Sequence, residues 1–320
     1  SIVPEVFMDN KLFIGVDVSK EWLDIAIQSK PDVLRIGNTA DDVAVWAAFL
    51  PANAFVAFEP TGGYERVLRT GLHKAGMAFA RVHPNEVAAF RQRRGGKAKT
   101  DRLDARLLAE FAAVELSRRG LAPLVEGDDV LRELVARRRQ LVDVLQAERC
   151  RAGLATAAIV KASLDAMVEA IARALDGIEK AIASHVAASP ELARTAEVLQ
   201  SLKGVGPVTV HTLLGDLPEL GRLSGKEIAA LVGLAPQTRE SGKKAFRART
   251  GHGRPNVRRV LFNAARCAIR WNPVMKAFYD RLVTANKRPG KVALTAVMRK
   301  MLVTLNAIAR ESQPWRHVKA

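Results

Sequence analysis

The sequence contains few cysteines, and the two that are present, Cys150 and Cys267, lie far apart. Neither stands in a C-x-x-C pair or near clustered histidines, so the chain encodes neither a disulfide framework nor a structural zinc site. It also lacks a run that approaches the ~18 apolar residues of a membrane-spanning helix. The first residues, SIVPEVFMDNKL, lack the basic and then apolar layout of a secretion signal. We therefore expect a cytoplasmic protein that is not bound to a membrane.

Acidic residues are scarce compared with basic ones. The chain has 33 aspartates and glutamates against 50 lysines and arginines, a formal net charge of +17. Its 48% hydrophobic and 26% charged residues exclude a wholly disordered chain. Because bound cations release the counterions condensed on a polyanion, nucleic acid is the partner that this excess of positive charge favours.

The N-terminal part has the pattern of a mixed sheet. The 320 residues exceed what one hydrophobic core usually holds, roughly 250 to 300 residues, so two domains are the starting expectation. Three short runs rich in β-branched residues begin at Leu12, Trp22 and Asp32 and predict strands joined by hairpins. Helical and strand patterns then alternate as far as Arg93, which gives the order βββαβαβα. An antiparallel start followed by αβ crossovers predicts a ribonuclease-H-like sheet with helices on its faces.

Beyond Asp101 the pattern becomes helical. A segment from Val130 to Leu145 is followed by one in which apolar residues alternate at spacings of 4 and 3. These residues are Leu164, Val168, Ile171, Leu175, Ile178 and Ile182. This period predicts a coiled coil. The three arginines at 137–139 suit a projecting antiparallel pair that joins protomers into a dimer or tetramer better than a pair buried on its own domain.

We therefore predict three regions: residues 1–125 with the sheet, 126–195 with the helical pair, and 196–320, which are mostly helical. The last region contains Gly204-Val205-Gly206-Pro207 between two apolar helices. This segment resembles the turn of helix-hairpin-helix modules, in which backbone amides at a helix N-terminus hold a phosphate. A tight turn without an anion is the alternative, and it is the commoner use of two glycines so spaced.

Carboxylates follow the ends of two predicted strands. Asp17 lies in IGVDVSK and Glu59 in AFEPTGGY, where an unpaired carboxylate is costly to bury without a compensating cation. Asp101 and Asp104 stand at i and i+3 in KTDRLDARLLAEF, which places both on one helix face, where like charges repel. A hard divalent cation, Mg²⁺ or Mn²⁺, satisfies all four acids.

Each acid also has an ordinary explanation when it is taken alone. Asp17 suits a strand-end turn, and Glu59 suits a salt bridge. Asp101 suits a helix N-cap, and Asp104 suits a favourable first-turn charge. Their joint placement on a ribonuclease-H-like layout favours the metal site.

Cations surround the second pair of acids. Between Arg91 and Arg106 the chain has seven lysines and arginines but no acid other than these two. A metal site among cations suits a phosphate substrate, whereas a solvated charge run does not account for the neighbouring acids. We predict nucleic-acid contacts from Arg93, Arg94, Lys97 and Lys99.

A second basic segment contains Ser241. Eight cations and one acid lie between Arg239 and Arg259, and we predict nucleic-acid contacts here and in the glycine turn. The residues are Gly204, Gly206, Lys243, Lys244, Arg247 and Arg254. A serine in such a loop can bind phosphate, cap a helix or attack a phosphodiester, and spacing alone identifies no partner that would activate it.

Taken in chain order, these segments resemble a known family. IGVDVSK, FEPTGGY, KTDRLDA, GVGP, GLAP, ESG and GHGRPNVRR are similar to the ordered motifs of the DEDD transposases of the insertion-sequence 110/1111 family, relatives of the pilin-gene invertase. The resemblance implies a RuvC-like domain in which Asp17, Glu59, Asp101 and Asp104 hold Mg²⁺. It also implies a coiled-coil insertion and a C-terminal transposase domain whose nucleophile is Ser241. A noncoding bridge RNA would pair with target and donor DNA while the protein reads backbone and shape.

The expected activity is strand exchange of DNA. The acids would hold Mg²⁺ at the scissile phosphate while Ser241 attacks the phosphorus and stores the energy of the bond as a phosphoserine. One alternative is a metal-dependent junction resolvase or nuclease in which water attacks, and another is a non-catalytic scaffold that binds RNA or DNA. An actin-like ATPase or sugar kinase opens with a similar strand, aspartate and turn, but it needs a second glycine-rich phosphate loop that the helical sequence after Asp101 does not supply.

Overall fold

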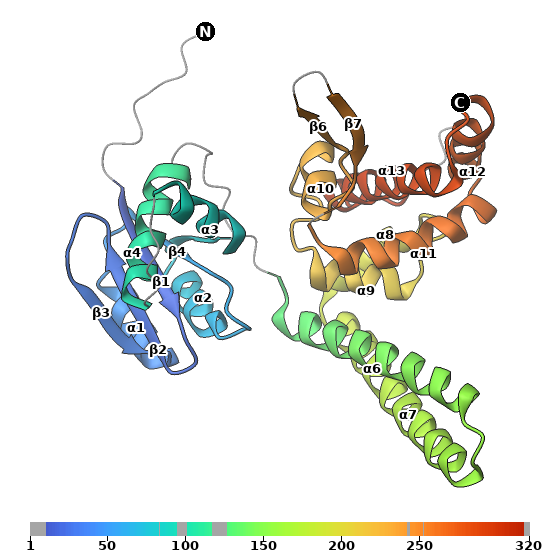
Figure 1. The fold of residues 1–320 in the computed structure, drawn as a ribbon, viewed down its shortest axis with the longest axis horizontal. Coiled ribbons are helices and arrows are strands. Elements are labelled where there is room, and N and C mark those ends of the chain that lie inside the picture. The colour runs from blue at the N-terminus through green and yellow to red at the C-terminus, as the bar shows by residue number, and fades with distance from the viewer. Residues whose placement is uncertain are drawn as a thin grey trace. The chain divides into compact units, whose positions relative to one another are not determined.

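The computed structural model describes residues 11–82, 84–94, 101–116, 127–241, 244–251 and 253–316, without the side chains of 101–103 and 237–249. The chain divides into two compact units, Ser1–Leu124 and Val125–Ala320. Each unit has its own hydrophobic core, so each is described by itself (Figure 1).

The N-terminal unit is built on a five-stranded sheet with the order β3-β2-β1-β4-β5. Three strands pair antiparallel: β1 (Leu12–Val18), β2 (Trp22–Ile27) and β3 (Val33–Gly37). Two further strands are parallel to β1: β4 (Ala54–Phe58) and β5 (Ala78–Arg81). The mixed sheet predicted from the sequence is confirmed.

Helices cover both faces of this sheet because its buried strands are apolar on both sides. On one face, Ile14 and Val16 pack with residues of two helices, α1 (Ala40–Ala48) and α2 (Glu65–Lys74). On the other face, Phe13 and Phe55 pack with α3 (Pro84–Arg93) and with α4 (Asp101–Phe111), which continues as the π-helical turn η1 (Ala112–Leu116). Alternate residues of β1 therefore belong to two separate cores.

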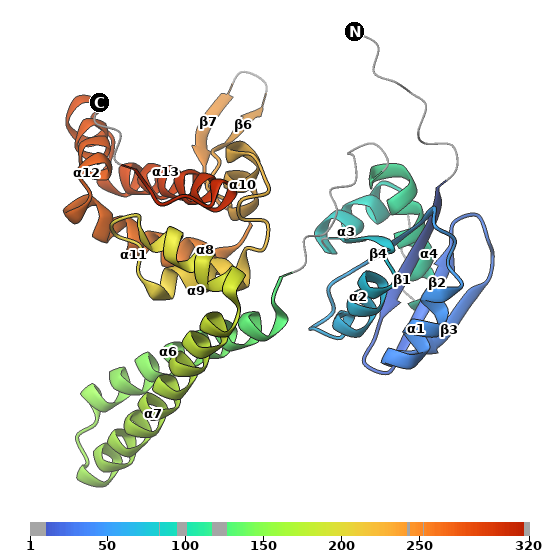
Figure 2. The same ribbon diagram turned by 180° about the vertical axis from the view of Figure 1, so that it is seen from behind.

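The second unit begins with two long antiparallel helices, α6 (Asp129–Leu154) and α7 (Ala158–Ala188). Leu145 and Ile171 belong to a small hydrophobic cluster between the two helices, and Figures 1 and 2 show the helices side by side. Near the other end, Val135 and Ile182 belong to the core of the C-terminal helices. The long antiparallel pair and the C-terminal helices therefore share one hydrophobic core. The domain boundary predicted after residue 195 lies inside α8 (Pro190–Gln200).

The remaining elements of this unit are mostly helical. They are α8 (Pro190–Gln200), α9 (Pro207–Asp216), α10 (Gly225–Val232), β6 (Gln237–Ser241), β7 (Lys244–Arg249), α11 (Pro255–Trp271), α12 (Pro273–Asp280), η2 (Arg281–Ala285) and α13 (Gly290–Glu311). β6 and β7 form an antiparallel hairpin. The sequence predicts a loop here, because charged residues hide the alternation of a strand.

Helix α13 is, in the part of the chain that the structure describes, the single helix long and apolar enough to cross a membrane. The sequence analysis assigned no segment this property. Half of its most apolar window is buried, and Val297, Met301 and Leu305 lie in the core of the unit. Its buried Asn306 donates to the carbonyl oxygen of Leu223 and accepts from the amide of Gly221, at 2.8 Å each. A core helix of this kind has the same length and composition.

Candidate active site

Asp17 and Glu59 lie at the same edge of the sheet. The parallel register of β1 and β4 places Val16 beside Phe58, and each acid is one residue further along its chain. Strand alternation directs both acids to the face that carries Phe13, Phe55 and α4. Both side chains are partly buried. The register therefore places Asp17 and Glu59 at neighbouring strand ends, and their role as metal ligands stays a prediction.

Helix α4 rests directly on β1 at a glycine. A Cβ atom on Gly15 would lie 2.1 Å from the carbonyl oxygen of Ala105 and 2.3 Å from the amide nitrogen of Ala109, so no other residue fits without displacing backbone. Asp17 is two residues beyond Gly15 on the same face, and Asp104 precedes Ala105. The contact thus brings the strand that carries Asp17 and the helix that carries Asp104 together.

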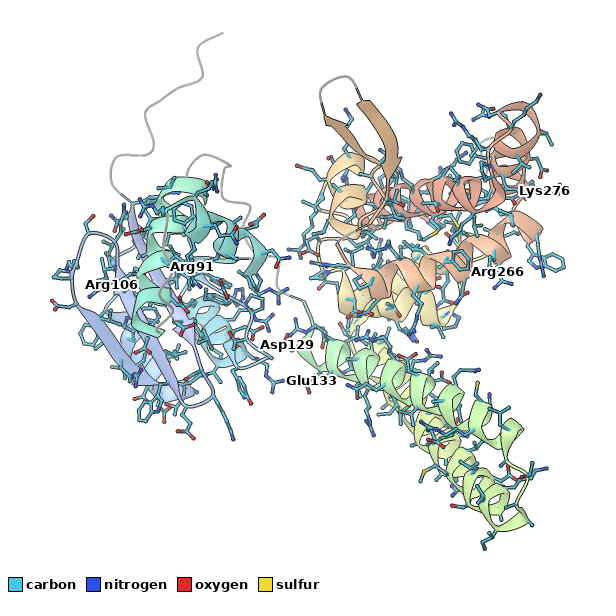
Figure 3. The ribbon with its side chains drawn as sticks, in the orientation of Figure 1. Arg91, Arg106, Asp129, Glu133, Arg266 and Lys276 are labelled. Atoms are coloured by element: carbon cyan, nitrogen blue, oxygen red, sulfur yellow. The ribbon has the colours of Figure 1, made fainter. Side chains whose placement is uncertain are left out.

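Asp104 already has a cationic partner. Arg91 of α3 forms an ion pair with its carboxylate, and both side chains are mostly buried (Figure 3). Asp101 occupies the first turn of α4, but its side chain lies outside the described residues. Among the side chains that are described, no group of three or more histidines, cysteines, aspartates or glutamates is gathered closely enough to hold a metal ion. Arg91 therefore compensates the charge of Asp104, one of the four acids that the sequence assigns to a metal.

Sequence reasoning missed an acid next to Asp17. Asp24 of β2 stands directly opposite Asp17 in the ladder, and its side chain is buried. Arg35 of β3 donates to both of its carboxylate oxygens, with Nε at 2.8 Å and Nη2 at 2.6 Å. A bidentate pair of this kind offsets the charge of Asp24. The signal was present in the sequence, because an aspartate interrupts the apolar run WLDIAI and an arginine interrupts VLRIG.

One side chain hydrogen-bonds to both of the loops that follow β1 and β4. The side-chain amide of Asn38 donates to the carbonyl oxygens of Ser19, at 2.8 Å, and Tyr64, at 3.0 Å. In the second loop, the buried carboxylate of Glu65 accepts from the amides of Thr61 and Gly63, and Gly63 has a φ of +98°. The FEPTGGY segment therefore needs its glycines for a left-handed backbone and its following glutamate to hold the turn.

The predicted phosphate-binding cations of the N-terminal unit fall into two groups. Arg93 pairs with Glu115 at 2.8 Å, and Arg94 pairs with Glu110. Both guanidinium groups also lie over the ring of Phe90, at 5.8 and 5.2 Å from its centroid. Lys97 and Lys99 lie outside the described residues. Arg93 and Arg94 are thus held at the surface of α3 by α4 and η1, with their positive charge partly offset.

Ser241 ends β6 and stands opposite Lys244 of β7. The base of the hairpin is fixed on α10 by two glycines: Gly233 caps α10 with a φ of +81°, and Gly253 has a φ of +65°. A Cβ atom on Gly253 would lie 2.3 Å from the carbonyl oxygen of Leu231. Lys243 lies outside the described residues, as do the side chains of Ser241, Lys244 and Arg247.

Arg254 is bound within the protein. Its guanidinium donates to the carbonyl oxygen of Asp216 at 2.7 Å and forms a bidentate pair with Glu219, with one contact at 2.6 Å. Burial raises the pKa of the Asp216 carboxyl, while the charges of Arg139 and Arg254 act in the opposite direction. Arg254 thus connects the start of α11 to the end of α9.

In the turn between α8 and α9, Gly204 is packed against another helix, whereas Gly206 has open space beside it. Gly204, with a φ of +104°, contacts Ala268 of α11, where a Cβ atom would lie 2.7 Å from the alanine side chain. Gly206 is the N-cap of α9 and has no heavy atom within 4 Å of an added Cβ. The first turn of α9 therefore begins at a glycine with open space beside it, as the helix-hairpin-helix prediction requires.

Comparison with known proteins agrees with this layout. A DEDD transposase model of the IS110 type matches residues 14–155, and the model of the transposase IS116/IS110/IS902 family matches residues 196–280. The first match contains the four acids and the second contains Ser241. The pilin gene-inverting proteins of Moraxella bovis and Moraxella lacunata are 25% and 24% identical to the chain. Each comparison covers 96% of this chain and 98% of the relative.

The two matches follow each other in the chain and define a DNA recombinase, an enzyme of the transposase class whose substrate is DNA. With both transposase domains present in this order, the chain belongs to the IS110 family of insertion-sequence transposases.

Proposed function

We propose that the chain is an RNA-guided transposase that cuts and rejoins DNA through a phosphoserine at Ser241. In this proposal the N-terminal unit is a RuvC-like, ribonuclease-H-like domain that holds Mg²⁺, and the C-terminal unit presents the nucleophile. The observation that carries the proposal is the placement of Asp17 and Glu59 at neighbouring strand ends, on the face where α4 carries Asp104.

Carboxylates are the ligands that a hard divalent cation prefers, and Asp17 and Glu59 lie on the sheet face that α4, the helix of Asp104, covers. Asp17, Glu59, Asp101 and Asp104 would hold Mg²⁺ or Mn²⁺, since oxygen ligands are what these ions prefer. When bound, the ion would offset negative charge on the oxygens of the scissile phosphate. Arg91 would then exchange its contact with Asp104 for one with the phosphate.

Ser241 would carry the bond exchange. Its Oγ forms a bond to phosphorus while the bond from phosphorus to the leaving strand's oxygen breaks, and that oxygen takes a proton and becomes a strand hydroxyl. Another strand's hydroxyl then attacks the phosphoserine and releases the serine. The number of phosphoester bonds is unchanged at each step, so strand exchange needs no ATP.

Positive charge supports a nucleic-acid partner beyond the DNA substrate. Between Ser241 and Tyr279 the chain has ten lysines and arginines and no acid. We infer that this region, the open N-terminus of α9 and the cations near Arg93 contact the phosphates of target DNA, donor DNA and a noncoding guide RNA. The guide RNA is proposed from the family resemblance, and we infer a cytoplasmic location from the nucleic acids that the protein would bind.

A covalent trap tests the nucleophile. The protein, its element DNA and transcribed flanking RNA are incubated with Mg²⁺, denatured and digested with protease, and DNA strands are examined for an attached peptide by mass spectrometry. We expect a peptide that contains Ser241 and no such product from Ser241→Ala. Cleaved DNA without a peptide, together with an active Ser241→Ala variant, would assign the protein to the water-using resolvases instead.

We also infer that the helical pair joins protomers into a dimer or tetramer. Leu141, Leu145 and Ile171 form a cluster of their own that is distinct from the core of the C-terminal helices. Residues 140–177 are replaced by a short flexible linker, so that the core positions Val135 and Ile182 remain. Light scattering with and without nucleic acid should then show a smaller assembly. If the shortened protein assembles as the parent does, the pair has no such role.

A further inference from the structure

Three arginines form a line along the outer face of α11. Arg259, Arg266 and Arg270 are separated by 7 and 4 residues, close to two turns and one turn of helix, so their side chains leave the same side. That side is opposite the buried stripe that includes Leu261 and Ala268. Figure 3 labels Arg266 on this face. The line faces away from the core and is open to a ligand.

Little negative charge offsets this line. Asp143 of α6 pairs with Arg259 at 2.9 Å, an exposed contact that contributes little to stability. Within the part of the chain that the structure describes, no carboxylate pairs with Arg266 or Arg270. Together with the acid-free stretch around α11, this leaves a positive surface whose complement is a polyanion.

Exposed aromatic side chains stand beside the arginines. Trp271, at the end of the line, is 70% exposed, and Phe262, on its flank, is 38% exposed. The buried amide of Asn272 donates to the carbonyl oxygen of Lys203 at 3.3 Å, and Gly204 contacts Ala268. The C-terminal end of α11 is therefore joined to the glycine turn, which also carries the exposed Lys203.

We propose that this face, made of Arg266, Arg270, Trp271, Phe262 and Lys203, binds an unpaired stretch of nucleic acid. It rests on the proposed function and adds which surface holds a strand that is not base-paired. Arg266 and Arg270, about 6 Å apart along the helix axis, would contact neighbouring phosphates, and unpaired bases would stack on the aromatic rings. Bases inside a duplex are stacked on one another and do not offer their faces, so the aromatics favour a single strand.

Cys267 reports directly on this face. It is exposed between Arg266 and Arg270, whereas Cys150, also exposed, lies on the helical pair and serves as the reference in the same molecule. The full chain is alkylated with iodoacetamide, and both peptides are quantified by mass spectrometry. The probes are an unstructured RNA of about 20 nucleotides, a DNA of the same sequence, and the DNA duplex. We expect several-fold slower alkylation of Cys267 with a single strand and an unchanged rate at Cys150.

Charge and stacking are then separated by variants. R266E/R270E should weaken single-strand binding at least tenfold and lower the slope of log affinity against log salt by about 1.4, from two lost phosphate contacts. K161E/R173E changes the net charge equally on an exposed side of α7 and should have a much smaller effect. Trp271→Ala should weaken the single strand several-fold and leave duplex affinity unchanged.

The proposal is overturned if duplex protects Cys267 as well as a single strand does, or if both charge-reversal pairs lose affinity equally. Tighter binding of RNA identifies the unpaired strand as the guide, and tighter binding of DNA identifies it as a displaced strand. These measurements need no cleavage. If Cys267 is protected but no serine-linked DNA forms, the face on α11 binds nucleic acid and the phosphoserine proposal is wrong. If serine-linked DNA forms but Cys267 is not protected, the phosphoserine proposal holds and the proposed face is wrong.

Discussion

The carboxylates of the first unit and the serine of the second are held in different ways. Asp17 and Glu59 end strands with neighbours on both sides, and a helix rests on one of those strands without space for a single methyl group. Ser241 ends a strand of a two-stranded hairpin, a form that is marginally stable by itself, and glycines fix the base of that hairpin on α10. The acids are therefore held by the core, whereas Ser241, the proposed nucleophile, is held by a local two-stranded hairpin.

The largest expected effects are losses of recombination. The carboxylates and Ser241 should then differ in how their variants change the stabilisation of the protein by Mg²⁺. Asp17→Ala should lower recombination by at least about 10³-fold, as loss of an essential catalytic group does. It should also abolish the rise in melting temperature caused by Mg²⁺, since binding to the native state raises stability. Ser241→Ala should lose recombination equally but keep that rise. Asp41→Ala, an exposed acid of the same unit, is the control. An unchanged Mg²⁺ response in Asp17→Ala would contradict the carboxylate site.

A pair of glycine substitutions compares the two supports. Gly15→Ala drives a methyl group into the backbone of α4 and should lower the free energy of unfolding by about 1–3 kcal/mol or more. Gly253→Ala meets backbone at a positive φ and should cost a similar amount. Gly177→Ala in α7 has open space and should gain up to about 1 kcal/mol.

Urea unfolding measures these changes, and activity tells the supports apart. Gly15→Ala should weaken the stabilisation by Mg²⁺, whereas Gly253→Ala should leave it intact and lower the yield of serine-linked DNA. If Gly253→Ala behaves like Gly177→Ala in both measurements, the hairpin is not fixed through its base.

The smallest expected effect concerns Arg91. It tests whether a metal ion can take the place of Arg91 as the partner of Asp104. Arg91→Gln leaves the mostly buried Asp104 without its partner, which should cost about 1–3 kcal/mol without metal. Mg²⁺ should reduce that deficit, because it compensates the same carboxylate. Arg35→Gln breaks the similar pair with Asp24, which is not a predicted ligand, and its deficit should not change with Mg²⁺. Equal responses of the two variants would contradict metal binding at Asp104. Thermal unfolding with and without Mg²⁺ gives both numbers.

Elements with strong periodicity could be predicted from the sequence. Alternation in LFIGVDV and the apolar run AFVAF identify the central strands, and the register of β1 and β4 brings together Asp17 and Glu59, as expected. The hairpin was missed because RES and KAFRAR carry charge where alternation would show. Sequence could not reveal that Arg91 and Arg254 are held by acids, since such pairs join residues 13 and 35 positions apart through the fold.

The amide of Asn38 has a consequence for motion. It donates to the carbonyl oxygens of Ser19 and Tyr64, so opening either of the loops that follow β1 and β4 costs one of the two bonds made by the same amide group. Because one amide group bridges both loops, we expect their local opening to be coupled, and Asn38→Ala should speed amide hydrogen exchange in both. Asp17 and Glu59 each precede one of these loops, so a single side chain restrains the backbone that follows both acids.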